Sequence, residues 1–363
     1  MEIYLFVIFL VCVYAVLIFL KGATKRREKI FIILSCITMF SVMGARNISV
    51  GTDTELYCKI FERISASDNI FTVAQASWLY ALYNKIISLV LGNYSQWIII
   101  FNSLIIIVGI GFFIYNNSRN MAMSMLYFLL FYHYFQSFNI SRQYIAIVLT
   151  ANSFYFIKNK NLKGFMTLNL IATLFHNTSI VFMPMGILSL LELNFKKTII
   201  FSAVSGVMII FYEKLIAAFL YIFPRYSIYF GGNTSFYETG QGRKIIITLI
   251  YLMVVIISLI IMARLSKLQN YHKEKERELA ILIVIMLIAI ICGILSMKSI
   301  LISRIELYYS IFAIILIPFV IEEFKKYKYL LYFVSICVML IPTYIQLNDN
   351  IGGIVPYGVF FQW

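Results

Sequence analysis

Four short polar stretches in an otherwise apolar chain hold the side chains best suited to chemistry. They contain Arg46 and Asp53, Arg142 and Gln143, His176, and Arg304 and Glu306. Arginine offers a rigid, weakly hydrated fork of hydrogen-bond donors that matches phosphate oxygens. Several arginines at one site therefore indicate a polyanionic ligand. At a membrane surface, the natural polyanion is a lipid-linked diphosphate.

The first polar stretch, residues 46–57, is the densest in hydrogen-bonding groups. It contains Arg46, Gly51, Thr52, Asp53, Thr54 and Tyr57. We expect this stretch to form one wall of an active site at the outer face of a membrane, with Gly51 allowing a close approach of the backbone. Asp53 has no neighbouring aspartate, and the sequence shows no acidic cluster suited to Mg²⁺ or Mn²⁺. We therefore expect a site without metal or cofactor, in which arginines neutralise the anion.

The arginines also have interpretations without chemistry. Arg46 and Arg304 could be interfacial anchors whose long side chains reach for lipid headgroups. Arg142 begins an apolar run, where an unpaired charge is costly, and it could instead form an intramembrane pair with Glu306 or Asp53.

The remaining candidates have structural alternatives as well. His176 could be a satisfied interfacial histidine, and Asp53 could cap a helix that starts near Glu55. Exterior aromatic residues such as Tyr57 and Tyr229 could belong to the membrane's aromatic belt or could stack on sugar rings.

Composition places the chain in a membrane. Of its 363 residues, 62% are hydrophobic and only 13% are charged, whereas a soluble domain carries about 25% charged residues. Long apolar runs without alternation predict membrane helices rather than barrel strands. The net charge of +14 could indicate nucleic acid, but basic residues flanking spans on the cytoplasmic side explain it better. Five cysteines form no metal or disulfide motif.

The apolar runs predict one polytopic domain over residues 1–363, with about twelve spans and both termini outside. The expected spans are 3–20, 30–44, 97–115, 121–136, 144–157, 165–175, 180–191, 199–223, 245–263, 279–297, 306–320 and 329–345. We expect an exterior region at about 45–95 with a helix lying at the interface near 78–87. A second exterior loop is expected at about 224–244, and a charged cytoplasmic loop at about 264–278.

The polar stretches resemble, in order, the motifs of the EpsG family among Wzy-type polysaccharide polymerases. The first match is Arg46 with Val50-Gly51-Thr52-Asp53-Thr54 and Tyr57. The next two are Asn139 with Arg142, Gln143 and Ala146, and Phe175-His176 with Thr178-Ser179. Arg304 with Tyr308 is similar to a later, looser motif. The resemblance runs from about residue 30 to 310, while 224–244 matches nothing that we can place in the family.

This resemblance implies a multi-span glycosyltransferase of the bacterial inner membrane, similar to other lipid-dependent ones. Such polymerases take undecaprenyl-diphosphate-linked oligosaccharides at the periplasmic face for O-antigen or exopolysaccharide. They transfer the growing glycan to the non-reducing end of a new lipid-linked unit. The implied partners are this donor and acceptor, membrane lipids and a chain-length regulator protein, with no nucleic acid.

Joined to the resemblance, the residues take expected roles. Arg142 and Arg304, with Arg46, would hold the donor diphosphate and stabilise the leaving group. His176 or Asp53 would orient or deprotonate the acceptor hydroxyl. Further substrate contacts are expected from Gly51, Thr52, Thr54, Tyr57, Asn139, Gln143, Arg225 and Tyr308.

Three other functions remain open from the sequence. A flippase for the same lipid-linked unit also needs an arginine-rich cavity, but its polar residues should lie at mid-span and on both faces. A ligase that moves finished glycan to another acceptor would use similar motifs. A scaffold of an export complex would need no cluster of exterior cations.

Overall fold

The computed structural model describes residues 1–20, 22–69, 73, 77–222, 241–267, 273–297 and 299–361. Over these residues the chain is helical, with one isolated antiparallel bridge between Arg46 and Val359 and no strand. The first elements are α1 (Glu2–Phe19), α2 (Lys25–Gly44), α3 (Thr54–Ala66), α4 (Trp78–Leu91), α5 (Gln96–Asn117), α6 (Met121–Leu130), α7 (His133–Asn139), α8 (Ser141–Asn152), α9 (Phe154–Lys158) and α10 (Leu162–Phe175). They are followed by the 3₁₀ helix η2 (Asn177–Gly186), α11 (Ile187–Leu190), α12 (Phe195–Ile210), α13 (Tyr212–Ile222), α14 (Gln241–Leu265), α15 (Lys273–Ser296), α16 (Ile300–Ser310), α17 (Ala313–Glu322) and α18 (Lys328–Asn348). The all-α class expected from the sequence is confirmed.

Among the described residues, six helical segments are long and apolar enough to cross a membrane. They are α1, α5, α14, α15, the continuous run of α16 and α17, and α18. α12 and α13 form a seventh candidate if the pair, bent by 71°, is one span. The chain is therefore an integral membrane protein, but the expected number of about twelve spans is not confirmed.

The remaining expected spans are too polar or too interrupted to form long apolar helices. α2 has 20 residues, but its first turn carries three cations and Glu28. The run predicted at 121–136 divides where Tyr132 adopts a φ of 65° between α6 and α7. Interrupted backbone of this kind is tolerated at membrane depth only where protein surrounds it, and Tyr132 is buried.

Two expected loops have different boundaries in the structure. α14 begins at Gln241, so the last four residues of the loop expected at 224–244 are helical. Residues 223–240 lie outside the described part of the chain. α15 begins at Lys273, so the end of the loop expected at 264–278 also belongs to a helix.

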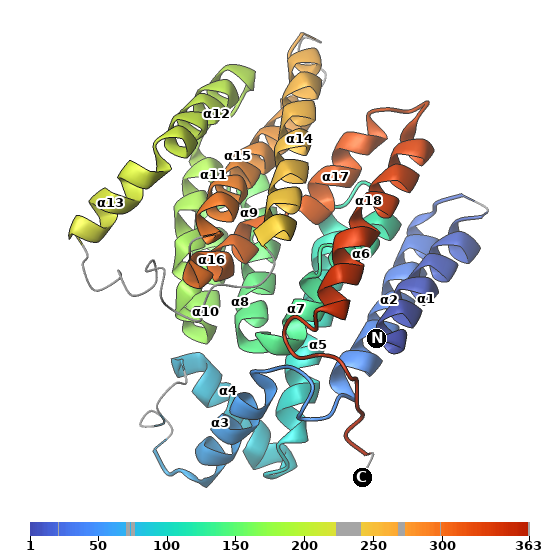
Figure 1. The fold of residues 1–363 in the computed structure, drawn as a ribbon, viewed down its shortest axis with the longest axis vertical. Helices are drawn as coiled ribbons and strands as arrows, with labels where there is room; N and C mark the ends of the chain where they lie inside the picture. The colour runs from blue at the N-terminus through green and yellow to red at the C-terminus, as the bar shows by residue number, and fades with distance from the viewer. Residues whose placement is uncertain are drawn as a thin grey trace.

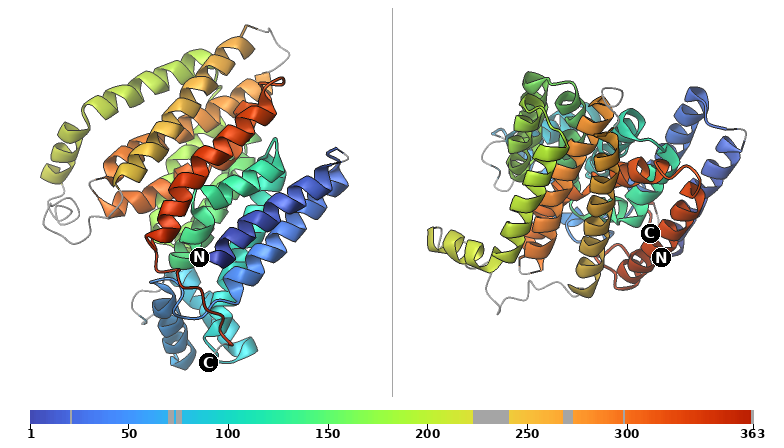
Figure 2. Two further views of the ribbon diagram at one scale, coloured as in Figure 1. Left: turned by 45° about the vertical axis from the view of Figure 1, so that its right-hand side comes forward. Right: turned by 90° about the horizontal axis from the view of Figure 1, so that it is seen from above.

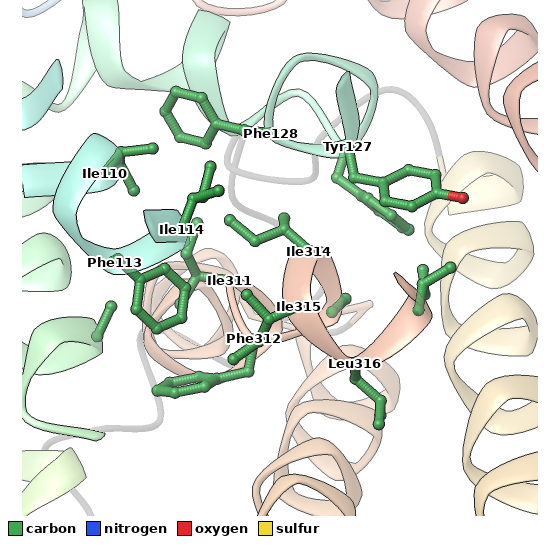
Figure 3. Close-up of a cluster of buried hydrophobic side chains, with 14 of the residues drawn as sticks. Ile110, Phe113, Ile114, Tyr127, Phe128, Ile311, Phe312, Ile314, Ile315 and Leu316 are labelled. Carbon is green, nitrogen blue, oxygen red and sulfur yellow. The ribbon is translucent and has the colours of Figure 1, made fainter. Parts of the chain in front are cut away.

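The long helices pack around an aromatic and aliphatic core (Figure 3). Residues of α5, α6 and α17, with the α16–α17 junction, form its centre. Figure 3 labels Ile110, Phe113, Ile114, Tyr127, Phe128, Ile311, Phe312, Ile314, Ile315 and Leu316. Figure 2 shows α1 and α2 at one side of this bundle and α12 with α13 at the other.

A glycine brings α8 close to α5. A Cβ placed on Gly109 would lie only 2.1 Å from Cγ1 of Val148. Small residues allow helix backbones to approach in membranes, where packing rather than water exclusion holds helices together. Asn152 of α8 adds a hydrogen bond to the Gly109 carbonyl at 2.9 Å. This contact fixes the position of α8, whose first turn carries Arg142.

Helices α3 and α4 form a separate layer across one end of the bundle (Figure 1). α3 turns its apolar face inward and buries Tyr57, Ile60, Phe61 and Ile64. Lys85 of α4 donates from Nζ to the carbonyls of Ser65 and Ser67, at 3.0 and 2.9 Å, and so satisfies the C-terminal end of α3. The two helices therefore form one unit.

Ion pairs fasten the helices at the other end. Glu278 of α15 accepts from Arg119 at 2.6 Å and from Lys158 at 3.3 Å. Glu322, beside the α17–α18 connection, pairs with Lys328 at 3.0 Å. Figure 1 places the α17–α18 connection at the end of the bundle opposite α3 and α4. These charges are thus remote from the α3–α4 layer.

Candidate active site

A cavity of about 180 Å³ lies between the α3–α4 layer and the bundle. Its lining residues are Asp53, Leu56, Tyr57 and Ile60 from the start of α3, Ile140, Arg142 and Gln143 around the start of α8, His176 between α10 and η2, and Arg304 of α16. Six of these nine residues were expected at the site from the sequence. Segments far apart in the chain thus meet at one cavity.

Asp53 and Arg304 form an ion pair across the cavity. Oδ2 of Asp53 lies 3.8 Å from Nη2 of Arg304. Asp53 occupies the N-cap position of α3, but its side chain makes no capping hydrogen bond. Burial raises the pKa of Asp53, while the nearby Arg304 and Arg142 oppose that rise. The carboxylate therefore faces the arginines instead of serving the helix end.

Gln143 joins the two arginine-bearing helices. Its Nε2 donates a hydrogen bond of 2.7 Å to the carbonyl of Arg304. The bond fixes the start of α8 against α16, so that Arg142 and Arg304 line the same cavity. Gln143 itself is buried, which makes its amide part of the framework as well as of the lining.

Arg142 lies over an aromatic ring. Its guanidinium carbon is 5.6 Å from the ring centroid of Tyr80 in α4, within the range of a cation–π interaction. Asn102 of α5 donates to the hydroxyls of Tyr80 and Ser141, at 3.3 and 3.2 Å. Three elements therefore support this one guanidinium, and a positioned arginine suits recognition of an anion.

His176 lines the cavity together with Asp53, Arg142 and Arg304. Burial and the positive charges of Arg142 and Arg304 lower the pKa of His176 to about 3. The imidazole is therefore neutral at neutral pH and can accept a proton. An anion bound to the two arginines would reduce their effect and raise this pKa.

Apolar side chains complete the cavity wall. Leu56, Ile60 and Ile140 line it beside the charged groups, and Leu56 is 41% exposed. Sequence reasoning missed these three residues. For Leu56 and Ile60, the signal was their spacing of four positions, which places them on the same side of α3. A cavity with cations and aliphatic groups suits an amphiphilic anion.

Arg46 does not line the cavity. It is 1% exposed, and its Nη1 donates to the Met43 carbonyl at 2.5 Å and to Ser103 Oγ at 3.2 Å. Nη2 donates to the Phe138 carbonyl at 3.2 Å. The guanidinium thus ties the end of α2 to α5 and α7. This placement gives Arg46 a structural role, in contrast with the substrate contact expected from the sequence.

The other residues of the first motif shape the loop before α3. Asn139 Oδ1 accepts from the Thr52 hydroxyl at 2.6 Å and from the Asp53 amide at 2.8 Å. The Thr54 hydroxyl donates to the Val50 carbonyl at 2.7 Å. Gly51 has a φ of 97°, and a Cβ there would lie 2.9 Å from the Phe138 carbonyl oxygen. These residues do not line the cavity but fix the backbone that presents Asp53.

Two more expected contacts are almost fully buried. Tyr308 is buried, with its hydroxyl 3.1 Å from that of Thr178. Tyr57 lines the cavity but is only 7% exposed, and its ring packs edge-on against Tyr80.

Glu306 is not a lining residue, and one of its carboxylate oxygens lies 3.6 Å from where a Cβ on Gly293 would be. Arg225 and Tyr229 lie outside the described residues.

Metal ligands do not cluster in the described part of the chain. No three side chains of His, Cys, Asp or Glu there lie close enough together to hold an ion.

Comparison with known proteins gives one match. The model of the EpsG family matches residues 29–359, nearly the whole chain and all the residues that line the cavity. No curated protein and no solved structure matches.

Proposed function

Because the chain belongs to the EpsG family, and so is a membrane protein related to polysaccharide biosynthesis, we propose that it polymerises lipid-linked oligosaccharide repeat units. The donor would be a growing glycan on undecaprenyl diphosphate. The acceptor would be the non-reducing end of a new lipid-linked unit. The observation that carries the proposal is the convergence of Arg142, Arg304, His176 and Asp53 on one partly apolar cavity.

The proposed reaction exchanges one bond to the anomeric carbon for another. An acceptor hydroxyl attacks the anomeric carbon of the donor glycan, and the bond from that carbon to the diphosphate oxygen breaks. The hydroxyl proton passes to His176 or Asp53, and undecaprenyl diphosphate leaves with the bonding electrons. Arg142 and Arg304 stabilise the negative charge that develops on the leaving diphosphate.

The arrangement of charges supports a site at the outer membrane face. The α17–α18 connection, after which Lys328 begins α18, lies at the end of the bundle opposite the α3–α4 layer (Figure 1). Basic residues flank spans preferentially on the cytoplasmic side, so the cavity beneath α3 and α4 would face the exterior. In a bacterium, the proposed catalysis would then take place on the periplasmic side of the inner membrane.

The exposed residues of α4 suit a helix that lies at a membrane interface. Its Trp78, Ile86, Leu89 and Val90 are all more than half exposed, while Lys85 turns back to α3. A 14-residue helix is too short to span a bilayer, which needs about 20 residues. We therefore place α4 along the outer interface, where its exposed apolar residues contact acyl chains and Trp78 lies near the headgroups.

The experiment that tests the function is a glycan ladder from a strain that lacks this gene. The strain is complemented with the wild-type chain, Arg142→Ala, Arg304→Ala or a matched remote variant, Arg119→Ala, each at equal membrane level. We expect a full ladder from the wild type and Arg119→Ala, and single repeat units from the two cavity variants.

Other outcomes would contradict the proposal in different ways. Units trapped on the cytoplasmic side would identify a flippase. Normal long chains that fail to reach their final acceptor would identify a ligase. A full ladder from both cavity variants would remove the arginines from the reaction.

A further inference from the structure

The C-terminal strap, residues 350–361, runs from the end of α18 toward the α3–α4 layer (Figure 1). It lies against the loop of residues 45–53, which presents Asp53 to the cavity. The bridge between Arg46 and Val359 is part of this contact. The two segments come from opposite ends of the chain, so neither one's sequence predicts the other's position.

Backbone hydrogen bonds join the strap to the loop at both ends of the loop. Near its start, the Phe360 amide donates to the Ala45 carbonyl at 3.0 Å and the Asn47 amide donates to the Gly358 carbonyl at 2.7 Å. Near its end, the amides of Gly51 and Thr52 donate to the carbonyls of Gly353 and Gly352, at 2.8 and 3.0 Å. The last two bonds are one and two residues from Asp53.

The strap is itself fixed to the bundle by hydrogen bonds of three tyrosine hydroxyls. The hydroxyl of Tyr4 in α1 donates to the Ile354 carbonyl at 2.6 Å. The hydroxyl of Tyr132 donates to the Ile351 carbonyl at 2.8 Å, and that of Tyr357 donates to the Val42 carbonyl at 2.9 Å. These bonds transmit the position of α1, α2 and α7 to the strap.

A close fit at Gly353 sets the register. Gly353 has a φ of 65°, and a Cβ there would lie 2.8 Å from Cγ2 of Thr52. On its other side, the Thr52 hydroxyl donates to Asn139, which also accepts from the Asp53 amide. Thr52 is thus held between the strap and Asn139.

From these contacts we propose that the C-terminal strap, together with Asn139, is a fixed positioning element that sets the place of Asp53 in the cavity. It acts through the backbone of the loop that ends at Asp53. The effect on catalysis rests on the proposed polymerase function, whereas the placement of the strap does not.

The first test is a cross-link that needs no activity. A Cβ on Gly358 would lie 3.5 Å from Cβ of Asn47, a distance compatible with a disulfide, for which Cβ atoms lie about 3.5–4.5 Å apart. We expect N47C/G358C to form this disulfide in membranes, as seen by peptide mass, and each single variant to remain unlinked. Absence of the bond would overturn the proposed placement. The cross-linked protein should keep full activity, because a strap that is already fixed loses nothing when it is linked to the loop. A loss of activity on oxidation that a reductant restores would instead mean that the strap must move, and would contradict a fixed element.

The second test uses a clash and its relief. Gly353→Ala should expose the amides of Gly51 and Thr52 to hydrogen exchange and lower the polymerisation rate about tenfold at unchanged membrane level. Thr52→Ser removes Cγ2 but keeps the hydroxyl, so the double variant should regain the part of both properties that is lost to the clash. The strain of an alanine at a φ of 65° would remain. Gly358→Ala, where the added Cβ would meet only an ordinary contact, is the matched control. The proposal fails if the amides of Gly51 and Thr52 exchange equally fast in Gly353→Ala and Gly358→Ala. It also fails if adding Thr52→Ser to Gly353→Ala restores neither the protection of these amides nor the rate. If Gly353→Ala changes the amide exchange as expected but the wild-type protein does not polymerise glycan, only the proposed function is refuted.

Discussion

The carboxylate of Asp53 lies 3.8 Å from the guanidinium of Arg304, although the two residues belong to opposite halves of the chain. At 3.8 Å the two charges attract each other, but the distance is longer than that of a hydrogen bond, and the Arg304 side chain remains partly exposed. A diphosphate that binds Arg304 would compete with Asp53 for it. Substrate binding would then release the carboxylate to accept a hydrogen bond from an acceptor hydroxyl.

This competition predicts the behaviour of the Asp53 variants. Asp53→Asn should strengthen donor binding, because it removes a competing negative charge, yet slow the reaction about 10²-fold if Asp53 serves the acceptor. Arg304→Ala should weaken donor binding in both the wild-type and Asp53→Asn backgrounds, and the two effects on binding should not add. KM and kcat for a synthetic lipid-linked unit measure both. A fall in donor affinity for Asp53→Asn would contradict the competition.

Arg142 should be more sensitive to substitution than a surface cation. Arg142→Ala should reduce kcat about 10²–10³-fold, as for loss of a positioned charge at a developing anion. Arg142→Lys should recover only part of this, because a lysine lacks the planar fork and its stacking on Tyr80. The control is Arg119→Lys at the other end of the bundle. Equal rates for Arg142→Lys and the wild type would show that only charge matters.

Some of this site could be predicted from the sequence for a clear physical reason. A cation such as Arg142 is expensive beside hydrocarbon, so its presence marks a function or a partner. The same reasoning identified Arg304, whereas His176 was expected from its polar stretch and from the motif Phe175-His176 with Thr178-Ser179. It could not show that Arg46 lies outside the cavity. The groups that accept its hydrogen bonds, the Phe138 carbonyl and the Ser103 hydroxyl, belong to helices far along the chain.

Other features depended on pairings that a linear pattern does not contain. Gly51 was expected to approach the site, but the structure brings it against the Phe138 carbonyl. The partners of Gly352 and Gly353 are backbone amides near the beginning of the chain, and backbone groups carry no sequence signal. The fold class was predictable from the composition and from the long apolar runs without alternation. The number of spans was not, because breaks such as that at Tyr132 come from packing.

The low pKa of His176 gives a pH prediction with a definite sign. In the free protein burial and the arginines lower the pKa to about 3, below its ordinary value near 6.5. The unfolded chain therefore binds a proton that the folded one does not, so stability present above pH 6.5 is lost as the pH falls toward 3. Thermal melting of the wild type should decline more steeply between pH 7 and pH 5 than that of His176→Gln.

The same residue predicts a difference between two kinetic profiles. If His176 is the base, kcat/KM, which reports the free enzyme, should show no loss from His176 down to about pH 5. The acid limb of kcat should lie at higher pH, because bound diphosphate offsets Arg142 and Arg304. His176→Gln should lack this limb and react about 10²-fold more slowly. A limb of kcat that persists in His176→Gln would assign the proton to another group, with Asp53 the next to test.

The expectation that the reaction needs no metal ion can be tested directly. If arginines alone neutralise the diphosphate, purified protein should polymerise lipid-linked units at an unchanged rate after dialysis against a chelator. Added Mg²⁺ or Mn²⁺ should not increase the rate. A loss on chelation that a divalent cation restores would show that arginines alone do not neutralise the anion.

Arg46 provides the contrast between a structural and a catalytic arginine. Arg46→Ala would leave the Met43 carbonyl without its side-chain donor, at a cost of about 1–3 kcal/mol for a buried unsatisfied group. The Phe138 carbonyl would keep only the Thr54 hydroxyl, at 3.3 Å. We expect a lower melting temperature and less protein in the membrane, with the activity per folded molecule nearly unchanged. Arg142→Ala should show the opposite, normal melting with little activity. Equal melting of Arg46→Ala and the wild type, together with lost activity, would return Arg46 to the substrate contacts that the sequence indicated.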